Sequence, residues 1–199
     1  MGPGAARLLI ELPVGFCDGR RRHQKIGIVQ RTRTVGFKAA LAKAWRLPAD
    51  NTDAIILLPA RMTGWKGHRE AIAAADRLSA MKAPPWRMIF AGDAQGRQGY
   101  LQELQQLIAQ YGLDDRIAIV GHCDDMPAAF ALADIVIAPS NEPEAFGRVA
   151  AEAGAMGGPV IGSSIGAQGE IIVDGQTGFV VPPKAPDTLA TAMADLLRR

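Results

Sequence analysis

Two carboxylates, Glu144 and Glu152, lie eight positions apart on either side of a glycine, Gly147. The run ADIVIAPS that precedes them is typical of a buried strand, and the Ala-rich run after Phe146 predicts a helix. The first N–H groups of such a helix have no partner within it, and together with the helix dipole they favour an anion. We expect an anion site formed by the amides of Phe146, Gly147, Arg148 and Val149.

The spacing of the two carboxylates matches part of a nucleotide sugar. If the residues between them are helical, Glu152 lies about two turns beyond Glu144, roughly 12 Å along the axis at 1.5 Å per residue, which is the length of a diphosphate with part of a ribose. One carboxylate would then meet a sugar and the other a nucleoside. The alternative is two surface carboxylates near a helix start, which the dipole alone stabilises by about 0.3–1 kcal/mol.

Two cations, Arg61 and Lys66, lie five positions apart where a predicted strand passes into a predicted helix. Arg offers a planar fork for phosphate oxygens and Lys a compact charge, and hydrogen bonds to charged groups contribute about 1.5–3 kcal/mol each. Both could therefore reach one diphosphate. Basic residues at a helix start are also common solvated positions, so the functional interpretation gains its weight from the turn at Gly147.

Two further strand ends carry candidate ligand contacts. Gly92 stands where a ligand or a neighbouring backbone approaches closely. The segment 121–126, GHCDDM, exposes backbone and short polar groups that could surround a nucleobase. Gly121, His122 and Met126 are therefore candidate contacts with the base.

The aspartates at these strand ends have structural explanations. We expect Asp93 to cap a turn and Asp124 to cap the helix that begins near Met126. Acidic pairs such as Asp124 and Asp125 also hold divalent metals, but capping accounts for them and we predict no metal site. His122 is disfavoured as a general base because the sequence identifies no carboxylate that would orient it.

Apolar runs of four to seven residues alternate with longer amphipathic stretches from residue 54 onward. The predicted strands are 54–60, 86–92, 116–121, 135–139, 159–163 and 178–182. The predicted helices are 66–81, 99–111, 126–132, 146–156, 168–174 and 186–197. This alternation requires right-handed crossovers, so the fold class is α/β with a doubly wound, Rossmann-like parallel sheet. Ligands of such sheets bind beyond the carboxyl ends of the strands, where each motif above lies.

Size and composition indicate a globular protein: the chain has 199 residues, of which 48% are hydrophobic and 21% charged. No apolar run approaches the roughly 20 residues that span a bilayer, and LLIELPVGF is too short and interrupted for a signal-peptide core, so we expect a cytoplasmic protein. Cys17 and Cys123 are isolated from each other and from any cluster of His. Neither a disulfide framework nor a zinc site is indicated.

Positive charge is concentrated in residues 1–49, where ten Lys or Arg stand against Glu11 and Asp18, a net charge of +8, whereas the remainder carries −6. Such a basic head could contact anionic lipid or nucleic acid. Because residues 1–35 lack helical or alternating periodicity, a solvated or partly disordered extension is favoured. We expect no nucleic-acid partner and leave peripheral contact with a membrane as an alternative.

Five segments resemble the carboxyl-terminal, donor-binding half of a family 4 retaining glycosyltransferase with the two-domain GT-B fold: ARMTGWKGH, FAGDA, IVGHCDDMPAAFALADIVIAPS, EPEAFGRVAAEAGAMGGPVI and GEIIVDGQTGFVVPP. The resemblance divides the chain into a basic extension or remnant, 1–39, and a nucleotide-sugar-binding domain, 40–199. It implies transfer of a hexose from a UDP-, GDP- or ADP-sugar to a glycan or glycolipid acceptor. Assembly of a cell-surface polysaccharide or lipopolysaccharide is the expected process.

The resemblance also implies roles for the motif residues. Arg61 and Lys66 would hold the diphosphate and neutralise charge that develops on the leaving group. Glu144 would contact or position the sugar, and Glu152 would bond the ribose hydroxyls. The amides of residues 146–149 would meet the phosphates.

The reaction implied by this resemblance retains the anomeric configuration. The leaving diphosphate accepts the proton of the incoming hydroxyl on the same face, so stabilising that diphosphate is the main electrostatic task of the protein. The loop 121–126 would border the base. No cofactor, metal or carboxylate nucleophile is required.

The acceptor-binding, amino-terminal domain of this family has no counterpart in residues 1–39, which are too few to form it. Ligand sites of the fold lie between two domains, so we expect this chain to form one wall of the cleft. It should bind donor weakly and transfer sugar poorly or not at all alone. The acceptor half could be truncated, lost or carried by a partner chain.

Two alternatives from other classes are weighed. One is a non-catalytic module that binds nucleotide sugar, or that docks through the basic head to a partner protein or a membrane. The other is a nicotinamide dehydrogenase, since doubly wound sheets often bind dinucleotides. The dehydrogenase fails because RMTGWK follows the first strand in place of a Gly-x-Gly-x-x-Gly motif.

Overall fold

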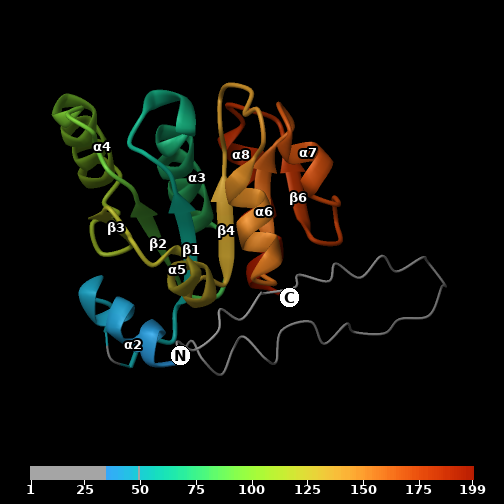
Figure 1. The fold of residues 1–199 in the computed structure, drawn as a ribbon. Coiled ribbons are helices and arrows are strands. Elements are labelled where there is room, and N and C mark those ends of the chain that lie inside the picture. Colours follow the sequence, from blue (N-terminus) through green and yellow to red (C-terminus); the bar gives the residue numbers. More distant parts are fainter. Residues whose placement is uncertain (1–34, 49) are drawn as a thin grey trace, which may run out of the picture.

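The computed structural model describes residues 35–199 except residue 49, and these form a six-stranded parallel sheet with helices on both faces (Figure 1). The strands are β1 (Ala54–Pro59), β2 (Trp86–Ala91), β3 (Ile117–Gly121), β4 (Ile135–Ala138), β5 (Val160–Ser163) and β6 (Gly178–Val181). All six predicted strands are present, with each end within one residue of its expected position. The α/β class and the Rossmann-like sheet are confirmed.

The strand order β3-β2-β1-β4-β5-β6 contains one reversal. The chain adds β2 and β3 on one side of β1, then crosses to β4 and adds β5 and β6 on the other side. In open α/β sheets the ligand crevice lies beyond the carboxyl ends of the strands at such a reversal. The loops that follow β1 and β4 are therefore neighbours at the edge where a ligand is expected.

The apolar runs form strands that are buried on both faces. In β1, Ile56 and Leu58 pack into the core on one face of the sheet, whereas Ile55 and Leu57 pack into the core on the other. This division follows from the alternation of side chains along a strand, and it explains why the run is continuously apolar rather than alternating. Each of these four side chains is at most 3% exposed.

The helices are α2 (Val35–Ala44), α3 (His68–Ala80), α4 (Gln98–Gln110), α5 (Met126–Leu132), α6 (Arg148–Ala155), α7 (Gln168–Ile171) and α8 (Pro186–Leu197), with a 3₁₀ turn, η1 (Gly64–Lys66), before α3. Buried residues of α3, α4 and α8 belong to one core, and those of α5 and α6 to the other. Figure 1 shows the sheet between these two layers.

Helix α2 was not predicted from the sequence, and the expected boundary at 39/40 falls within it. It packs against α5, below the sheet in Figure 1, and Trp45 just after its end is buried in the same core as Phe130 of α5. The sequence gives little sign of α2 because its polar residues do not separate cleanly from its apolar ones. The rest of the basic extension, 1–34, lies outside the described residues.

Two helices begin later than predicted, because a glycine in the left-handed conformation precedes each of them. Gly67 has φ 77° before α3, and Gly147 has φ 65° before α6. A Cβ at Gly67 would overlap the carbonyl oxygen of Pro139, so this position brings the loops after β1 and β4 into contact. The last predicted residues of the fifth helix are also not helical, since α7 ends at Ile171.

Within the part of the chain that the structure describes, no helix combines the length and the apolar character needed to cross a membrane.

Candidate functional site

Three loops meet beyond the carboxyl ends of β1, β4 and β5. The N–H of Asn141, after β4, donates to the carbonyl of Trp65, after β1, at 2.7 Å. The N–H of Ala167, after β5, donates to the carbonyl of Glu144 at 3.0 Å. Backbone hydrogen bonds therefore tie the Glu144 loop to its neighbours on both sides.

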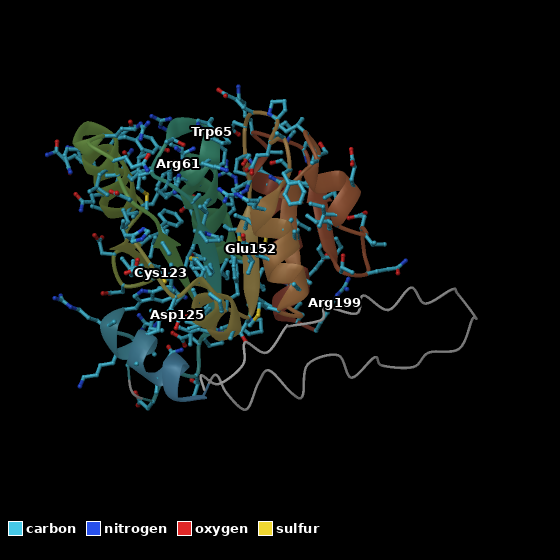
Figure 2. The ribbon with its side chains drawn as sticks, in the orientation of Figure 1. Arg61, Trp65, Cys123, Asp125, Glu152 and Arg199 are labelled. Carbon is cyan, nitrogen blue, oxygen red and sulfur yellow. The ribbon has the colours of Figure 1, made fainter. Side chains whose placement is uncertain are left out.

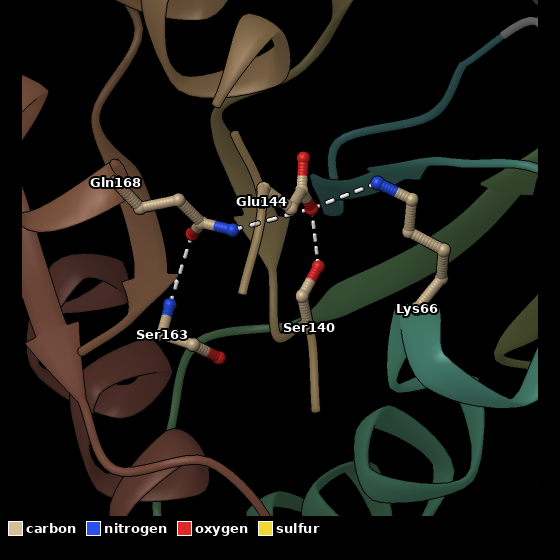
Figure 3. A network of polar contacts seen from close by, with 5 residues as sticks. All are labelled: Lys66, Ser140, Glu144, Ser163 and Gln168. Carbon is tan, nitrogen blue, oxygen red and sulfur yellow. Dashed lines mark hydrogen bonds and ion pairs between the residues drawn. The ribbon is translucent and has the colours of Figure 1, made fainter. Parts of the chain in front are cut away.

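Lys66 and Glu144 form the centre of this site. The Nζ of Lys66 lies 2.7 Å from Oε1 of Glu144, and the two side chains are 13% and 11% exposed. The same oxygen accepts a hydrogen bond from the hydroxyl of Ser140 and one from Nε2 of Gln168 at 3.3 Å (Figure 3). Three donors thus converge on one carboxylate oxygen at the strand-order reversal.

The second oxygen of Glu144 points away from these three donors in Figure 3. A carboxylate oxygen accepts hydrogen bonds, and Lys66 carries three donors of which Glu144 uses one. The pair can therefore offer an acceptor to a hydroxyl and a donor to an anion without breaking its own ion pair. The Nζ of Lys66 also lies 4.1 Å from the centroid of the Trp65 ring, a cation–π contact.

Helix α6 begins directly after Gly147, close to the predicted helix start. Gly147 turns the chain so that Arg148 and Val149 fall in the first turn, where a helix has no acceptor for their N–H groups. Phe146 is 65% exposed and Arg148 is exposed, so this first turn faces solvent. The helix start at this position is therefore observed, and an anion site formed by its amides stays a prediction.

The helix from which the spacing of the two carboxylates was estimated is shorter than expected. The estimate of 12 Å assumed a helix from Glu144 to Glu152, but α6 begins at Arg148, so only the second half of this segment rises at 1.5 Å per residue. Glu152 is exposed on α6, and Figure 2 shows it lower on the molecule than Arg61 and Trp65.

The structure separates Arg61 from the Lys66 network. Arg61 is exposed, and its Nη1 lies 3.4 Å from Oε1 of Gln95 in the loop after β2.

Gly92, in the same region, has a structural explanation: a Cβ there would overlap the carbonyl oxygen of Ala60. Of the two interpretations left open for Gly92, close approach of a neighbouring backbone is the one observed. Asp93 accepts a hydrogen bond from the N–H of Gln95 at 2.8 Å, as a turn-capping residue should.

The loop after β3 is more open. Gly121 has φ 74°, and a Cβ there would meet no atom within 4 Å. Oδ1 of Asp124 lies 3.0 Å from Nε2 of His122, but these side chains are 95% and 68% exposed. The helix cap is Asp125, whose Oδ1 accepts from the N–H of Ala128 at 3.0 Å. The prediction that Asp124 caps the helix was wrong, because the helix begins at Met126 and its cap is the residue immediately before.

His122 therefore does have a carboxylate beside it, contrary to the expectation from sequence. A contact this exposed contributes little to stability. Met126 is half-buried at the start of α5 and packs against the core on that face. Burial raises the pKa of the neighbouring Cys123 thiol, which disfavours its reactive thiolate. In residues 35–199, as far as described, no three His, Cys, Asp or Glu side chains are grouped so that they could hold a metal.

Three residues near the site were missed by the sequence reasoning. Ser140 and Gln168, four and 24 residues from Glu144, form hydrogen bonds to its carboxylate, and no local pattern marks them.

His68 is fully buried at the start of α3, with its ring centroid 5.2 Å from that of Phe90 in an edge-on arrangement. Burial lowers the pKa of His68 to about 4, so the ring is neutral. Its burial could have been read from the spacing of Ala71, Ile72 and Ala75 along the same helix face.

Fold and site together define a doubly wound α/β domain with a polar, anion-favouring edge at the strand-order reversal. The sequence matches the family model described as glycosyl transferases group 1 over residues 41–199. This chain belongs to that family.

Curated and solved relatives agree with this assignment. The chain is 32% identical over 168 residues to D-inositol 3-phosphate glycosyltransferase of Xylanimonas cellulosilytica, covering 81% of this chain but only 39% of that protein. The chain thus spans well under half the length of this relative.

Two solved structures show which half is matched. The C-terminal domain of a glycosyl transferase group 1 family protein from Francisella tularensis superposes with a TM-score of 0.68 at 32% identity, covering 79% of this chain and 82% of that one. The Anabaena protein HepE, solved with UDP and glucose, gives a TM-score of 0.72 at 31% identity, covering 81% of this chain and 42% of that one. HepE was also solved with UDP-glucose. The chain is therefore homologous to the C-terminal half of GT-B glycosyltransferases.

Proposed function

We propose that this chain is the donor-binding half of a retaining glycosyltransferase that transfers a hexose from a nucleotide sugar to a glycan or glycolipid acceptor. The observation that carries the proposal is the Lys66–Glu144 pair, which is largely buried near the start of α6 at the strand-order reversal. A cation with unused donors, a carboxylate with a free oxygen and unpaired helix amides match a diphosphate attached to a sugar.

In this proposal the donor diphosphate lies between Lys66 and the amides of residues 146–149. Lys66 bonds a phosphate oxygen while keeping Glu144, and Arg61, which is exposed, turns from Gln95 towards the same phosphates. The outward oxygen of Glu144 accepts a sugar hydroxyl. Glu152 meets the ribose, and the loop 121–126 borders the base. The proposal takes support from HepE, which binds UDP and UDP-glucose.

The chemical step of this proposal is the one that the family resemblance implies. The bond between C1 of the sugar and the diphosphate oxygen breaks, and a bond from C1 to the acceptor oxygen forms on the same face. The acceptor proton passes to the departing phosphate oxygen. Lys66 and Arg61 stabilise the charge that grows on the diphosphate, which is where this mechanism needs electrostatic help.

The experiment is calorimetric titration of the full chain with UDP, GDP and ADP, and with UDP-glucose, GDP-mannose and ADP-glucose, in metal-free buffer. We expect saturable binding of one nucleotide and its sugar, which would identify the base. If none binds at millimolar concentration, the proposal is wrong.

A non-catalytic nucleotide-sugar-binding module is a second candidate, because the described residues correspond to only the C-terminal half of the homologous enzymes. Both candidates predict the same donor contacts. They differ in the release of free nucleotide from the bound nucleotide sugar in the presence of an acceptor. We expect this release to be slow for the chain alone and to rise when an acceptor-binding half is supplied; no release under either condition would favour the binding module.

A further inference from the structure

The side chain of Gln168 is buried next to Glu144, in a space that neighbouring glycines leave open. It is the first residue of α7 and is 1% exposed, although polar residues at a helix start are usually solvated. Two glycines make room for it. A Cβ at Gly162 would overlap its Oε1, and a Cβ at Gly147 would lie 3.3 Å from its Cγ. The side chain is therefore enclosed by the strand β5 and by the turn that opens α6.

The hydrogen bonds of Gln168 fix which way its amide faces. The backbone N–H of Ser163 approaches one end of the amide at 2.9 Å, and because an N–H only donates, that end must be the oxygen. The NH₂ group then faces Oε1 of Glu144 at 3.3 Å (Figure 3). An NH₂ group offers only donors, so it favours Glu144 as a carboxylate that accepts.

We propose that Gln168 is a positioning residue, which holds Glu144 as an oriented carboxylate so that its outward oxygen can receive a hydroxyl of the donor sugar. This assignment rests on the proposed function, in which Glu144 contacts the sugar. Gln168, Ser140 and Lys66 all bond the same oxygen, and Figure 3 shows the other oxygen directed away from them. Gln168 thus connects β5 to the sugar-binding side chain without touching the ligand.

A purely structural role would be to satisfy the buried N–H of Ser163. Gln168→Glu separates the two roles, because the new side chain keeps an oxygen for Ser163 but places an acceptor against Glu144. Gln168→Met removes both contacts at a similar side-chain length. Gln176→Glu is the matched control: it adds the same charge on the exposed turn before β6, away from the Glu144 network.

The readout is the ratio of affinities for a nucleotide sugar and its nucleotide, measured by calorimetry. The probes are UDP-glucose with UDP, GDP-mannose with GDP, and ADP-glucose with ADP. In Gln168→Glu and Gln168→Met we expect the nucleotide sugar to lose about tenfold more affinity than the nucleotide, the size of one charge-assisted hydrogen bond. Gln176→Glu should leave the ratio unchanged.

A reciprocal exchange, Gln168→Glu with Glu144→Gln, sharpens the test. The exchange again places a donor opposite an acceptor, so the decrease in urea midpoint caused by Gln168→Glu should be largely reversed. The preference for the nucleotide sugar over the nucleotide should not return, because position 144 then carries no carboxylate. If the unchanged chain binds a nucleotide and its sugar but the ratio is the same in both Gln168 variants, the positioning role is wrong and the donor site stands. If the unchanged chain binds none of the probes, both proposals fall together.

Discussion

The two ends of the candidate site are built differently. At the reversal between β1 and β4, the side chains of Lys66 and Glu144 are largely buried, and side-chain and backbone hydrogen bonds connect three loops around them. At the end of β3, His122 and Asp124 touch each other but are largely exposed, and a Cβ added at Gly121 would meet no atom within 4 Å. The first region is preorganised, whereas the second can adapt.

This difference matches the proposed division of labour. A site that stabilises developing charge must be fixed before the reaction, because reorganisation would cost part of the stabilisation. A loop that only borders a base can read it through backbone groups and tolerate movement. The two histidines within the described residues follow the same division: His68 is buried next to the first region, and His122 is exposed in the second.

The largest contrast is expected from glycine substitution. Gly67→Ala places a Cβ onto the Pro139 carbonyl at a positive φ, whereas Gly121→Ala has the positive φ but no overlap. We expect Gly67→Ala to lose roughly 4 kcal/mol or more of unfolding free energy and Gly121→Ala about 1–2 kcal/mol. Urea unfolding of both variants measures this, and equal losses would remove the distinction between a fixed and an open region.

The buried His68 should make the stability of the fold depend on pH. The folded-state pKa of His68, about 4, lies below its unfolded value, so between the two the unfolded chain binds a proton that the folded chain does not. The contribution of neutral His68 to the free energy of unfolding is complete above about pH 6.5. As the pH drops, the free energy of unfolding falls by about 2 kcal/mol at pH 5 and by roughly 3 kcal/mol below pH 4. His68→Phe should reduce the difference in unfolding free energy between pH 7.5 and pH 5. An unchanged difference in His68→Phe would contradict the assignment.

Glu152→Gln tests whether the exposed carboxylate on α6 belongs to the site. If it bonds ribose hydroxyls, the substitution should weaken a bound ribonucleotide by about 1.5 kcal/mol and its 2′-deoxy analogue by less. Calorimetry with the two nucleotides measures the difference. An equal effect on the ribonucleotide and its 2′-deoxy analogue would show that Glu152 does not bond the ribose hydroxyls.

The smallest effect is expected at Asp124. Asp124→Asn removes an exposed partner of His122, and we expect neither the urea midpoint nor the affinity for nucleotide to change measurably. A clear loss of affinity would show that the open loop is more organised in the bound state than in the free one. Asp125→Ala is the comparison, since it removes the cap of α5 and should lower the midpoint.

The sheet could be predicted because its signal is local. Runs such as AIILLP are continuously apolar over the length of a strand. A helix start is likewise indicated by Gly147 and the Ala-rich run after it. The candidates Lys66 and Glu144 were identified from their positions after predicted strands. These features depend on residues that are near one another in the sequence.

What could not be predicted depends on pairing over long distances. Gln168 lies 24 residues from Glu144, and its burial is decided by glycines on two other elements. Helix α2 is fixed by packing on α5 rather than by its own pattern. Asp124 and Asp125 were interchanged because the exact start of a short helix decides which of two adjacent residues is the cap.

The central claim is that Lys66, held by Glu144, binds the diphosphate of a donor. The most direct measurement is calorimetric titration of the chain, of Lys66→Ala and of Lys82→Ala with a nucleoside diphosphate and with its nucleoside. Lys82 is exposed just beyond the opposite end of α3 and serves as the charge-matched control. We predict that Lys66→Ala alone weakens the diphosphate by roughly 1.5–3 kcal/mol and leaves the nucleoside nearly unchanged. Equal losses for the two ligands, or no loss for either, would contradict the account.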